Sequence, residues 1–220
     1  MSGLLPYSVG MSDTCYRLYY VHDPMCSWCW AFRSVWTEIR ADLLSEITIV
    51  SLLGGLAADS DTPMPTHQQT DIRHHWQTIE QQVPGTYFNF DFWTQCTPRR
   101  STYPACRAVI AAGKQGQEHQ ETMILAIQKA YYLQAKNPSD VEVLIDLAGE
   151  IGLDEMHFTA DFQAQETQNR LLHESALARQ IGAQGFPSLI VAQQNTYQSV
   201  PIDYCDSALM LRRLHALLTA

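Results

Sequence analysis

Residues 15–53 read CYRLYYVHDPMCSWCWAFRSVWTEIRADLLSEITIVSLL, and this stretch decides the fold. Residues 15–22 are rich in aromatic and β-branched types and predict a short buried strand. Residues 26–44 predict a helix, because apolar side chains recur there at helical spacing. Residues 47–53 are almost continuously apolar, which indicates a second buried strand. A strand, a helix and a strand in close succession predict a right-handed βαβ unit with parallel strands.

The middle of the chain is predicted to be helical. Residues 58–66 form a connector rich in Pro, Asp and Thr, after which Thr66 and Gln69 match a capping box for a helix ending at Pro84-Gly85. Ser139 and Glu142 are expected to cap a later helix. The other predicted helices cover a segment from Pro104 to about Gly113, residues 117–135 and residues 166–181, the last closed by Gly182.

The strand pattern returns near the C-terminus. Residues 188–191 and 196–202 predict a hairpin with its turn at Gln194-Asn195, and Asp206 or Ser207 is placed to cap a final amphipathic helix. The order βαβ, helices, ββα predicts an α/β domain formed by residues 12–57 and 166–220. Residues 58–165 would then be a helical insertion.

Composition excludes several classes of protein. The chain has 220 residues, of which 46% are hydrophobic and 17% charged, as in a globular protein, and its net charge is −9. An acidic balance without a Lys/Arg cluster argues against nucleic acid or a membrane surface as a partner. Residues 1–10 lack the basic and apolar regions of a secretory signal and resemble a loose extension before Met11, a second possible start. We therefore expect a cytoplasmic protein whose six cysteines are mostly reduced.

The strongest chemical signal is Cys26-Ser27-Trp28-Cys29 at the predicted junction of strand and helix. Free backbone N–H groups and the dipole at a helix N-terminus favour a thiolate, the nucleophile of disulfide exchange. Cys26 is expected to attack, and Cys29, three residues later on the same face, to resolve a mixed disulfide. Half of a zinc site or a purely structural pair are the alternatives, but zinc needs two further ligands at close spacing, and Cys96 and Cys106 are ten residues apart.

A second motif, Gly185-Phe186-Pro187-Ser188, stands directly before a strand of the predicted hairpin. A cis peptide bond before Pro187 would turn the chain sharply at that point. Alone this signal is weak, since most X-Pro bonds are trans, but it becomes informative together with the strand, the cysteine pair and the helix upstream.

Residues 23–30 (DPMCSWCW) together with Gly185-Phe186-Pro187 resemble the DsbA-like branch of the thioredoxin superfamily, in particular its cytoplasmic, FrnE-type predicted disulfide isomerases. The resemblance covers nearly the whole chain and implies a thioredoxin fold with a large all-helical insertion. It implies that Cys26 is the nucleophile and Cys29 the resolving thiol. It also implies that Pro187, with Phe186 before it, belongs to a cis-proline loop that lies beside the dithiol and holds extended substrate.

The resemblance implies a thiol–disulfide oxidoreductase or isomerase that acts on protein or small-molecule disulfides and thiols. No metal or organic cofactor is expected, because glutathione or a partner dithiol can supply electrons. Ser27 and Trp28 replace the Pro-His of strongly oxidising members, so we expect a weaker oxidant. One alternative is a kappa-class glutathione-dependent transferase or isomerase of the same fold, although such proteins usually carry serine where Cys26 stands and lack the second cysteine. Another is a chaperone-like binding module with a vestigial dithiol.

Other residues have two interpretations each. Trp28, with Trp30 and Phe32, forms an apolar rim for substrate or packs under the insertion. His22 tunes Cys26 or shuttles its proton, or is an ordinary residue at a strand end. Cys106 is a third low-pKa thiol or a small buried residue. The remaining candidates are interpreted as ordinary thiols and surface groups: Cys15, Cys96, Cys205, His74, His75, Arg99 and Arg100.

Overall fold

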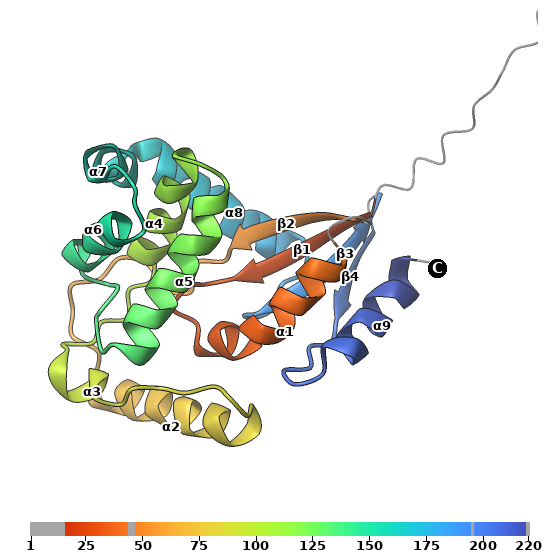
Figure 1. The fold of residues 1–220 in the computed structure, drawn as a ribbon, viewed down its shortest axis with the longest axis horizontal. Coiled ribbons are helices and arrows are strands. Elements are labelled where there is room, and N and C mark those ends of the chain that lie inside the picture. The colour runs from red at the N-terminus through yellow and green to blue at the C-terminus, as the bar shows by residue number, and fades with distance from the viewer. Residues whose placement is uncertain (1–15, 44–46, 195, 219–220) are drawn as a thin grey trace, which may run out of the picture.

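The computed structural model describes residues 16–43, 47–194 and 196–218 (Figure 1). Four strands form a mixed sheet in the order β2-β1-β3-β4. Strand β1 is parallel to β2 and antiparallel to β3, and β3 and β4 form an antiparallel hairpin. The strand bounds are Tyr16–His22 (β1), Thr48–Leu53 (β2), Ser188–Gln193 (β3) and Thr196–Val200 (β4). The predicted α/β fold with a helical insertion is confirmed, whereas the predictions for residues 1–10, Met11, Cys15 and Asn195 concern positions outside the described residues.

Helices cover both faces of the sheet, because the side chains of a strand point alternately to either side. Leu18 and Tyr20 of β1 pack against α1 (Ser27–Leu43) and α9 (Ser207–Leu218). Tyr19 and Val21 point to the opposite face, where Ala178 of α8 (Gln165–Gln180) covers them. The core therefore holds β1 rigidly, and α1 begins at its carboxyl end.

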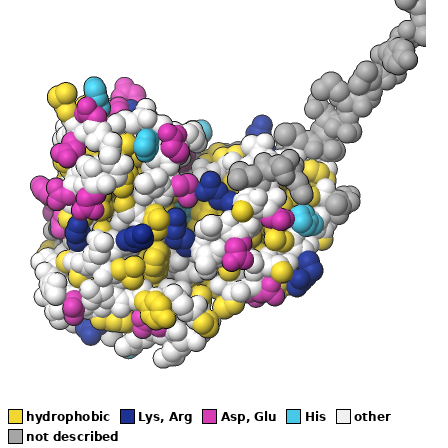
Figure 2. All heavy atoms as spheres, viewed as in Figure 1, with side chains coloured by type: hydrophobic (Ala, Val, Ile, Leu, Met, Phe, Trp, Pro, Cys, Tyr) yellow, Lys and Arg dark blue, Asp and Glu magenta, His cyan; other side chains and the backbone are white. Residues whose placement is uncertain are grey.

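Six helices lie between β2 and α8 and form the insertion. Their bounds are Thr66–Gln82 (α2), Phe92–Gln95 (α3), Tyr103–Lys114 (α4), Glu118–Leu133 (α5), Val141–Glu150 (α6) and Glu155–Gln163 (α7). Figure 1 shows α4 to α7 grouped at one end of the sheet, with α2 and α3 beneath them. Figure 2 shows acidic side chains gathered over α6 and α7 and basic side chains across the middle of the same face.

Two predicted caps are wrong. Thr66 is the first residue of α2 rather than its cap, Pro65 precedes the helix, and Gln69 donates its side-chain amide to the Met64 carbonyl at 2.8 Å. Ser139 does not cap α6 either, because its hydroxyl donates to the Ser101 carbonyl at 2.7 Å. In both cases a contact outside the helix takes the polar side chain away from the helix end.

The predictions for two other helix ends are confirmed. Asp206 caps α9, since its carboxylate accepts the Leu209 N–H at 2.7 Å. Gly182 follows α8 with φ +95°, the left-handed conformation that glycine adopts readily. The short helix α3 and helix α7 were not predicted, although Asp154 caps α7 by accepting the His157 N–H.

The insertion has its own hydrophobic core, centred on the fully buried Trp76 of α2. Its ring contacts a group of aromatic side chains, namely Phe88, Phe90, Phe92, Trp93, Tyr131 and Tyr132. The exact boundaries of the predicted domains, at residues 57/58 and 165/166, stay a prediction. Among the helices of the described residues, none combines the length and the apolar character needed to cross a bilayer.

Replacing this ring should destabilise the protein strongly. We expect Trp76→Ala to lower the free energy of unfolding by about 3–5 kcal/mol, the usual cost of truncating a buried Trp. Chemical denaturation followed by circular dichroism measures the loss. The control His74→Ala removes an exposed side chain of the same helix and should change the value by less than about 0.5 kcal/mol. Equal stability of the two variants would contradict a core centred on Trp76.

Candidate active site at the start of helix α1

Two backbone hydrogen bonds fix the turn between β1 and α1. The N–H of Cys26 donates to the Asp23 carbonyl at 3.1 Å, and the Cys26 carbonyl accepts the Trp30 N–H at 3.1 Å. Cys26 therefore directly precedes α1, where free N–H groups and the helix dipole favour negative charge. The sequence placed the cysteine pair at this junction, and the structure has it there.

The two thiols differ in exposure. Both are free, but 8% of the Cys26 surface is exposed against 1% of Cys29. Burial raises the pKa of the Cys29 thiol well above its ordinary value, and a hydrogen bond with Cys26 raises it further. Cys26 is thus the thiol that an incoming molecule can reach, while Cys29 lies behind it.

The loop before β3 lies against Cys26. The Cys26 thiol donates to the Phe186 carbonyl at 3.5 Å, and the peptide bond between Phe186 and Pro187 is cis. The Phe186 ring lies on Gly54, so closely that a Cβ atom there would come within 1.9 Å of a ring carbon. The structure therefore brings Phe186 and Pro187 beside the dithiol, with the backbone of Phe186 at the sulfur and its ring packed away from it.

A cavity of about 710 Å³ opens on Cys26. Its walls come from the start of α1, one face of α2, the segment before α4, and the end of α8 with the loop that follows. Charged and titratable side chains line it, namely Asp71, His75, Arg99, Arg100 and Arg179. Asp140 pairs with Arg99, whereas no acidic side chain within the described ranges forms an ion pair with Arg100 or Arg179. The cavity is therefore locally basic in an acidic protein.

Most of these cavity residues were missed or interpreted as surface groups. No motif in the sequence marks His75, Arg99 or Arg100 as a binding residue, and Arg179 was not identified as a candidate. His75 lies seven residues after Gln68, on the α2 face that lines the cavity. Helical spacing groups such residues on one face, but only the packing of α2 against the site shows what that face meets.

The three aromatic residues of the expected rim have different positions. Trp28 lines the cavity and packs on Tyr204, with ring centroids 4.9 Å apart. Trp30 stacks on Tyr132 of the insertion, and Phe32 is fully buried in the core. Of the three, Trp28 alone lines the cavity.

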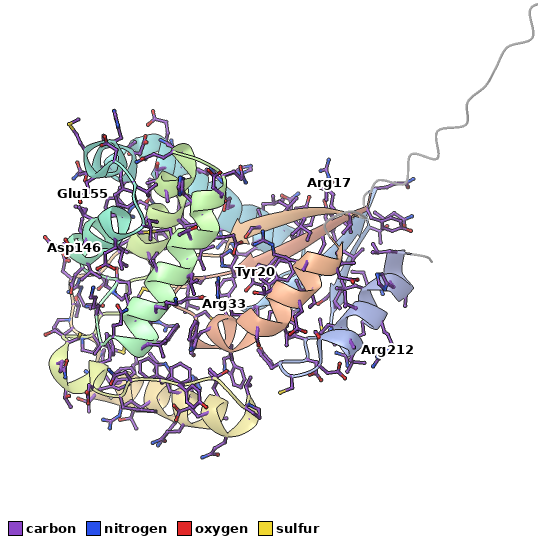
Figure 3. All side chains as sticks on the ribbon, viewed as in Figure 1. Arg17, Tyr20, Arg33, Asp146, Glu155 and Arg212 are labelled. Atoms are coloured by element: carbon purple, nitrogen blue, oxygen red, sulfur yellow. The ribbon has the colours of Figure 1, made fainter. Side chains whose placement is uncertain are left out.

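His22 is buried beneath the dithiol. Its Nε2 lies 2.8 Å from the Ser51 hydroxyl, and its ring stacks on Tyr20. Burial lowers the pKa of His22 to about 3, so the ring is neutral near neutral pH and brings no positive charge to Cys26. Figure 3 shows Tyr20 and Arg33 in the same region, where Arg33 donates to Gln128 of α5 at 3.1 Å. A tuning role for His22 stays a prediction.

Cys106 does not line the cavity. It is fully buried in α4, and its thiol contacts a carboxylate oxygen of Asp23 at 3.6 Å. Burial raises the pKa of Cys106 well above its ordinary value, and the charge of Asp23 adds to this effect. A buried, protonated thiol is a poor nucleophile, so this position favours the packing interpretation over a third reactive cysteine.

Asp23 is the functional candidate that sequence reasoning missed. The side chain is fully buried, and its carboxylate accepts hydrogen bonds from Met25, Leu56, Thr102 and Cys106. Burial raises the pKa of Asp23 above its ordinary value, and these hydrogen bonds offset only part of the rise. In the sequence its only signal is its place just before the cysteine pair. Across residues 16–43, 47–194 and 196–218, no three His, Cys, Asp or Glu side chains are gathered as a metal site requires.

Comparisons with known proteins agree on the fold. A candidate protein disulfide isomerase from Nitrosomonas europaea is 29% identical, covers 93% of this chain and 98% of its own, and superposes with a TM-score of 0.82. The cytosolic disulfide reductase DsbM from Pseudomonas aeruginosa is 21% identical, with coverage of 92% and 98% and a TM-score of 0.73.

Curated relatives include the ClpXP adapter protein SpxH from Halalkalibacterium halodurans, which is 21% identical over 81% of this chain. The chain spans about three fifths of the length of the curated relatives it matches, 59% and 57%. A family model described as Thioredoxin matches residues 19–208. The chain therefore belongs to the thioredoxin family, and its fold is similar to those of DsbA-like proteins.

Proposed function

We propose that the protein catalyses thiol–disulfide exchange as a disulfide reductase or isomerase, with Cys26 as the nucleophile and Cys29 as the resolving thiol. The observation that carries this proposal is the placement of the pair. One thiol stands on the wall of a cavity at a helix N-terminus, and the second is buried directly behind it. This arrangement suits a thiol that attacks first and a thiol that completes the exchange.

The exchange proceeds in two steps. The Cys26 thiolate attacks one sulfur of a substrate disulfide, a bond forms between these sulfurs, and the other substrate sulfur leaves as a thiolate. Cys29 then attacks the Cys26 sulfur, its proton passes to the second leaving thiolate, and the protein becomes a disulfide while the substrate gains two electrons. Two molecules of glutathione, or a partner dithiol, return these electrons to the protein. In isomerisation a thiolate of the substrate displaces Cys26 instead.

Neighbouring groups support both steps. The Phe186 carbonyl accepts a hydrogen bond from the Cys26 thiol, and Phe186 and Pro187 would align the backbone of a peptide substrate beside it. Trp28 adds an apolar side chain to the wall of the cavity. The mechanism uses only sulfur chemistry of the chain and its substrates, so we propose no metal or organic cofactor.

We propose glutathione as the electron donor. A volume of about 710 Å³ lies within the range of small-molecule sites. The guanidinium groups of Arg100 and Arg179 can bind the carboxylates of such a thiol. A related structure of DsbM, 22% identical to this chain, is described as containing GSH. The same neighbour is described as cytosolic, and we propose that location for this protein as well.

Substitution of each cysteine tests the assigned roles. We expect Cys26→Ser to lower the glutathione-dependent reduction of hydroxyethyl disulfide and of insulin to the uncatalysed rate, because the nucleophile is lost. Cys29→Ser should accumulate a mixed disulfide on Cys26, seen as an added mass by mass spectrometry under non-reducing conditions. Cys205→Ser, which removes an exposed free thiol, serves as the control.

Retained reduction by Cys26→Ser would refute the proposed function. A kappa-class transferase needs no second cysteine, so Cys29→Ser with unchanged transferase activity and no trapped mixed disulfide would favour that alternative.

The basic residues of the cavity should govern the use of glutathione. We expect Arg100→Gln with Arg179→Gln to raise the KM for glutathione roughly tenfold, a loss of about 1.4 kcal/mol of binding. Rates with the uncharged thiol 2-mercaptoethanol should not change. Arg73→Gln, on an exposed part of α2 outside the cavity, is the matched control. An unchanged KM for glutathione in the double variant would show that the thiol binds elsewhere.

A further inference from the structure

One face of helix α2 forms a wall of the cavity that opens on Cys26. Five residues of α2 line the cavity at helical spacing, namely Gln68, Asp71, Ile72, His75 and Trp76. The fully buried Trp76 fixes the orientation of this face, and its ring centroid lies 5.6 Å from that of Tyr131, which also lines the cavity. The side chain of Asp71 therefore stands on a helix face that is held toward the site.

Asp71 supplies the negative charge of this cavity. Among the described residues that line it, Asp71 alone is acidic. Its carboxylate forms no hydrogen bond or ion pair with another residue of the ranges 16–43, 47–194 and 196–218. The oxygens of Asp71 are thus available to a ligand that enters the cavity.

The positive charges of the cavity come from other segments. Arg100 lies just before α4 and Arg179 at the end of α8, where the Ser175 hydroxyl accepts a hydrogen bond from the Arg179 guanidinium at 3.0 Å. The segment before α4 is tied to the start of α2, because the Met64 N–H donates to the Pro98 carbonyl at 2.7 Å. The described walls of the cavity thus present one carboxylate and two guanidinium groups that no oppositely charged side chain neutralises.

These charges define a complementary ligand. An ammonium group can pair with the carboxylate, and two carboxylates can pair with the guanidinium groups. A thiol that carries an α-amino acid group and a second carboxylate has this pattern, and glutathione is such a thiol. A thiol with the same carboxylates but no amine would meet Asp71 as a like charge, which disfavours binding. Asp71 can therefore distinguish two classes of anionic thiol that the arginines alone would bind equally well.

We propose that Asp71 is a specificity-determining residue that binds the ammonium group of an α-amino acid, so that the site accepts thiols and mixed disulfides of amino acid type and disfavours anionic ones without an amine. The inference rests on the proposed function and names the substrate class of the same site. Asp71 takes no part in the exchange of sulfur bonds. Because it belongs to the insertion, the insertion contributes selectivity as well as a wall.

The test measures the binding of reduced thiols to the reduced protein, where no disulfide is present and no exchange occurs. Isothermal titration calorimetry compares glutathione with glutaryl-cysteinylglycine, which is glutathione without its α-amino group. We expect the wild type to bind glutathione about fivefold more tightly, which is the upper range for an ion pair at an exposed position.

Asp71→Asn should remove this preference from both sides. The Kd for glutathione should rise about threefold, because the ammonium group loses its partner, and the Kd for glutaryl-cysteinylglycine should fall roughly twofold, because a like charge is removed. Asp71→Glu keeps the charge and should keep the preference. The control Asp61→Asn removes an exposed acidic side chain of the segment before α2, outside the cavity, and should match the wild type.

The opposite signs separate recognition of the amine from a structural role, since a distorted site would weaken both ligands. Equal Kd values of the two ligands for the wild type would overturn the inference, as would constants that stay unchanged or move in a common direction in Asp71→Asn. Catalysis is a separate measurement. An active wild type without the preference overturns this inference alone, whereas the preference in a protein whose Cys26→Ser variant still reduces disulfides overturns the proposed function alone.

Discussion

The N–H of Cys26 donates to the carbonyl of Asp23 at 3.1 Å, and the Cys26 carbonyl in turn accepts the N–H of Trp30. Through these bonds a strand buried in the sheet changes into a helix within a few residues. The sheet holds β1 from both faces, so the turn has little freedom to move. Because the turn is rigid, the first thiol faces the cavity and the second faces the protein interior. The proposed order of attack follows from this difference.

The sheet and the insertion contribute different parts of the site. Strand β1, helix α1 and the loop at Pro187 place the sulfurs and the carbonyl that contacts one of them. The insertion supplies part of the cavity wall, through α2, the segment before α4 and Tyr131 of α5. Its own aromatic core around Trp76 keeps α2 in place. A domain without the insertion would leave the same cysteines at an open surface, with no enclosed basic cavity for a small thiol.

Local patterns in the sequence predicted the parts of the fold that depend on neighbours in the chain. The βαβ unit and the hairpin follow from runs of apolar residues and their spacing, and Asp206 caps α9 as expected. The predicted caps at Thr66 and Ser139 were wrong because backbone carbonyl groups outside the helices, those of Met64 and Ser101, accept the hydrogen bonds of Gln69 and Ser139. The partners of Asp23 are 33, 79 and 83 residues away along the chain. No periodicity or motif records such contacts, so the sequence did not identify Asp23 as a candidate.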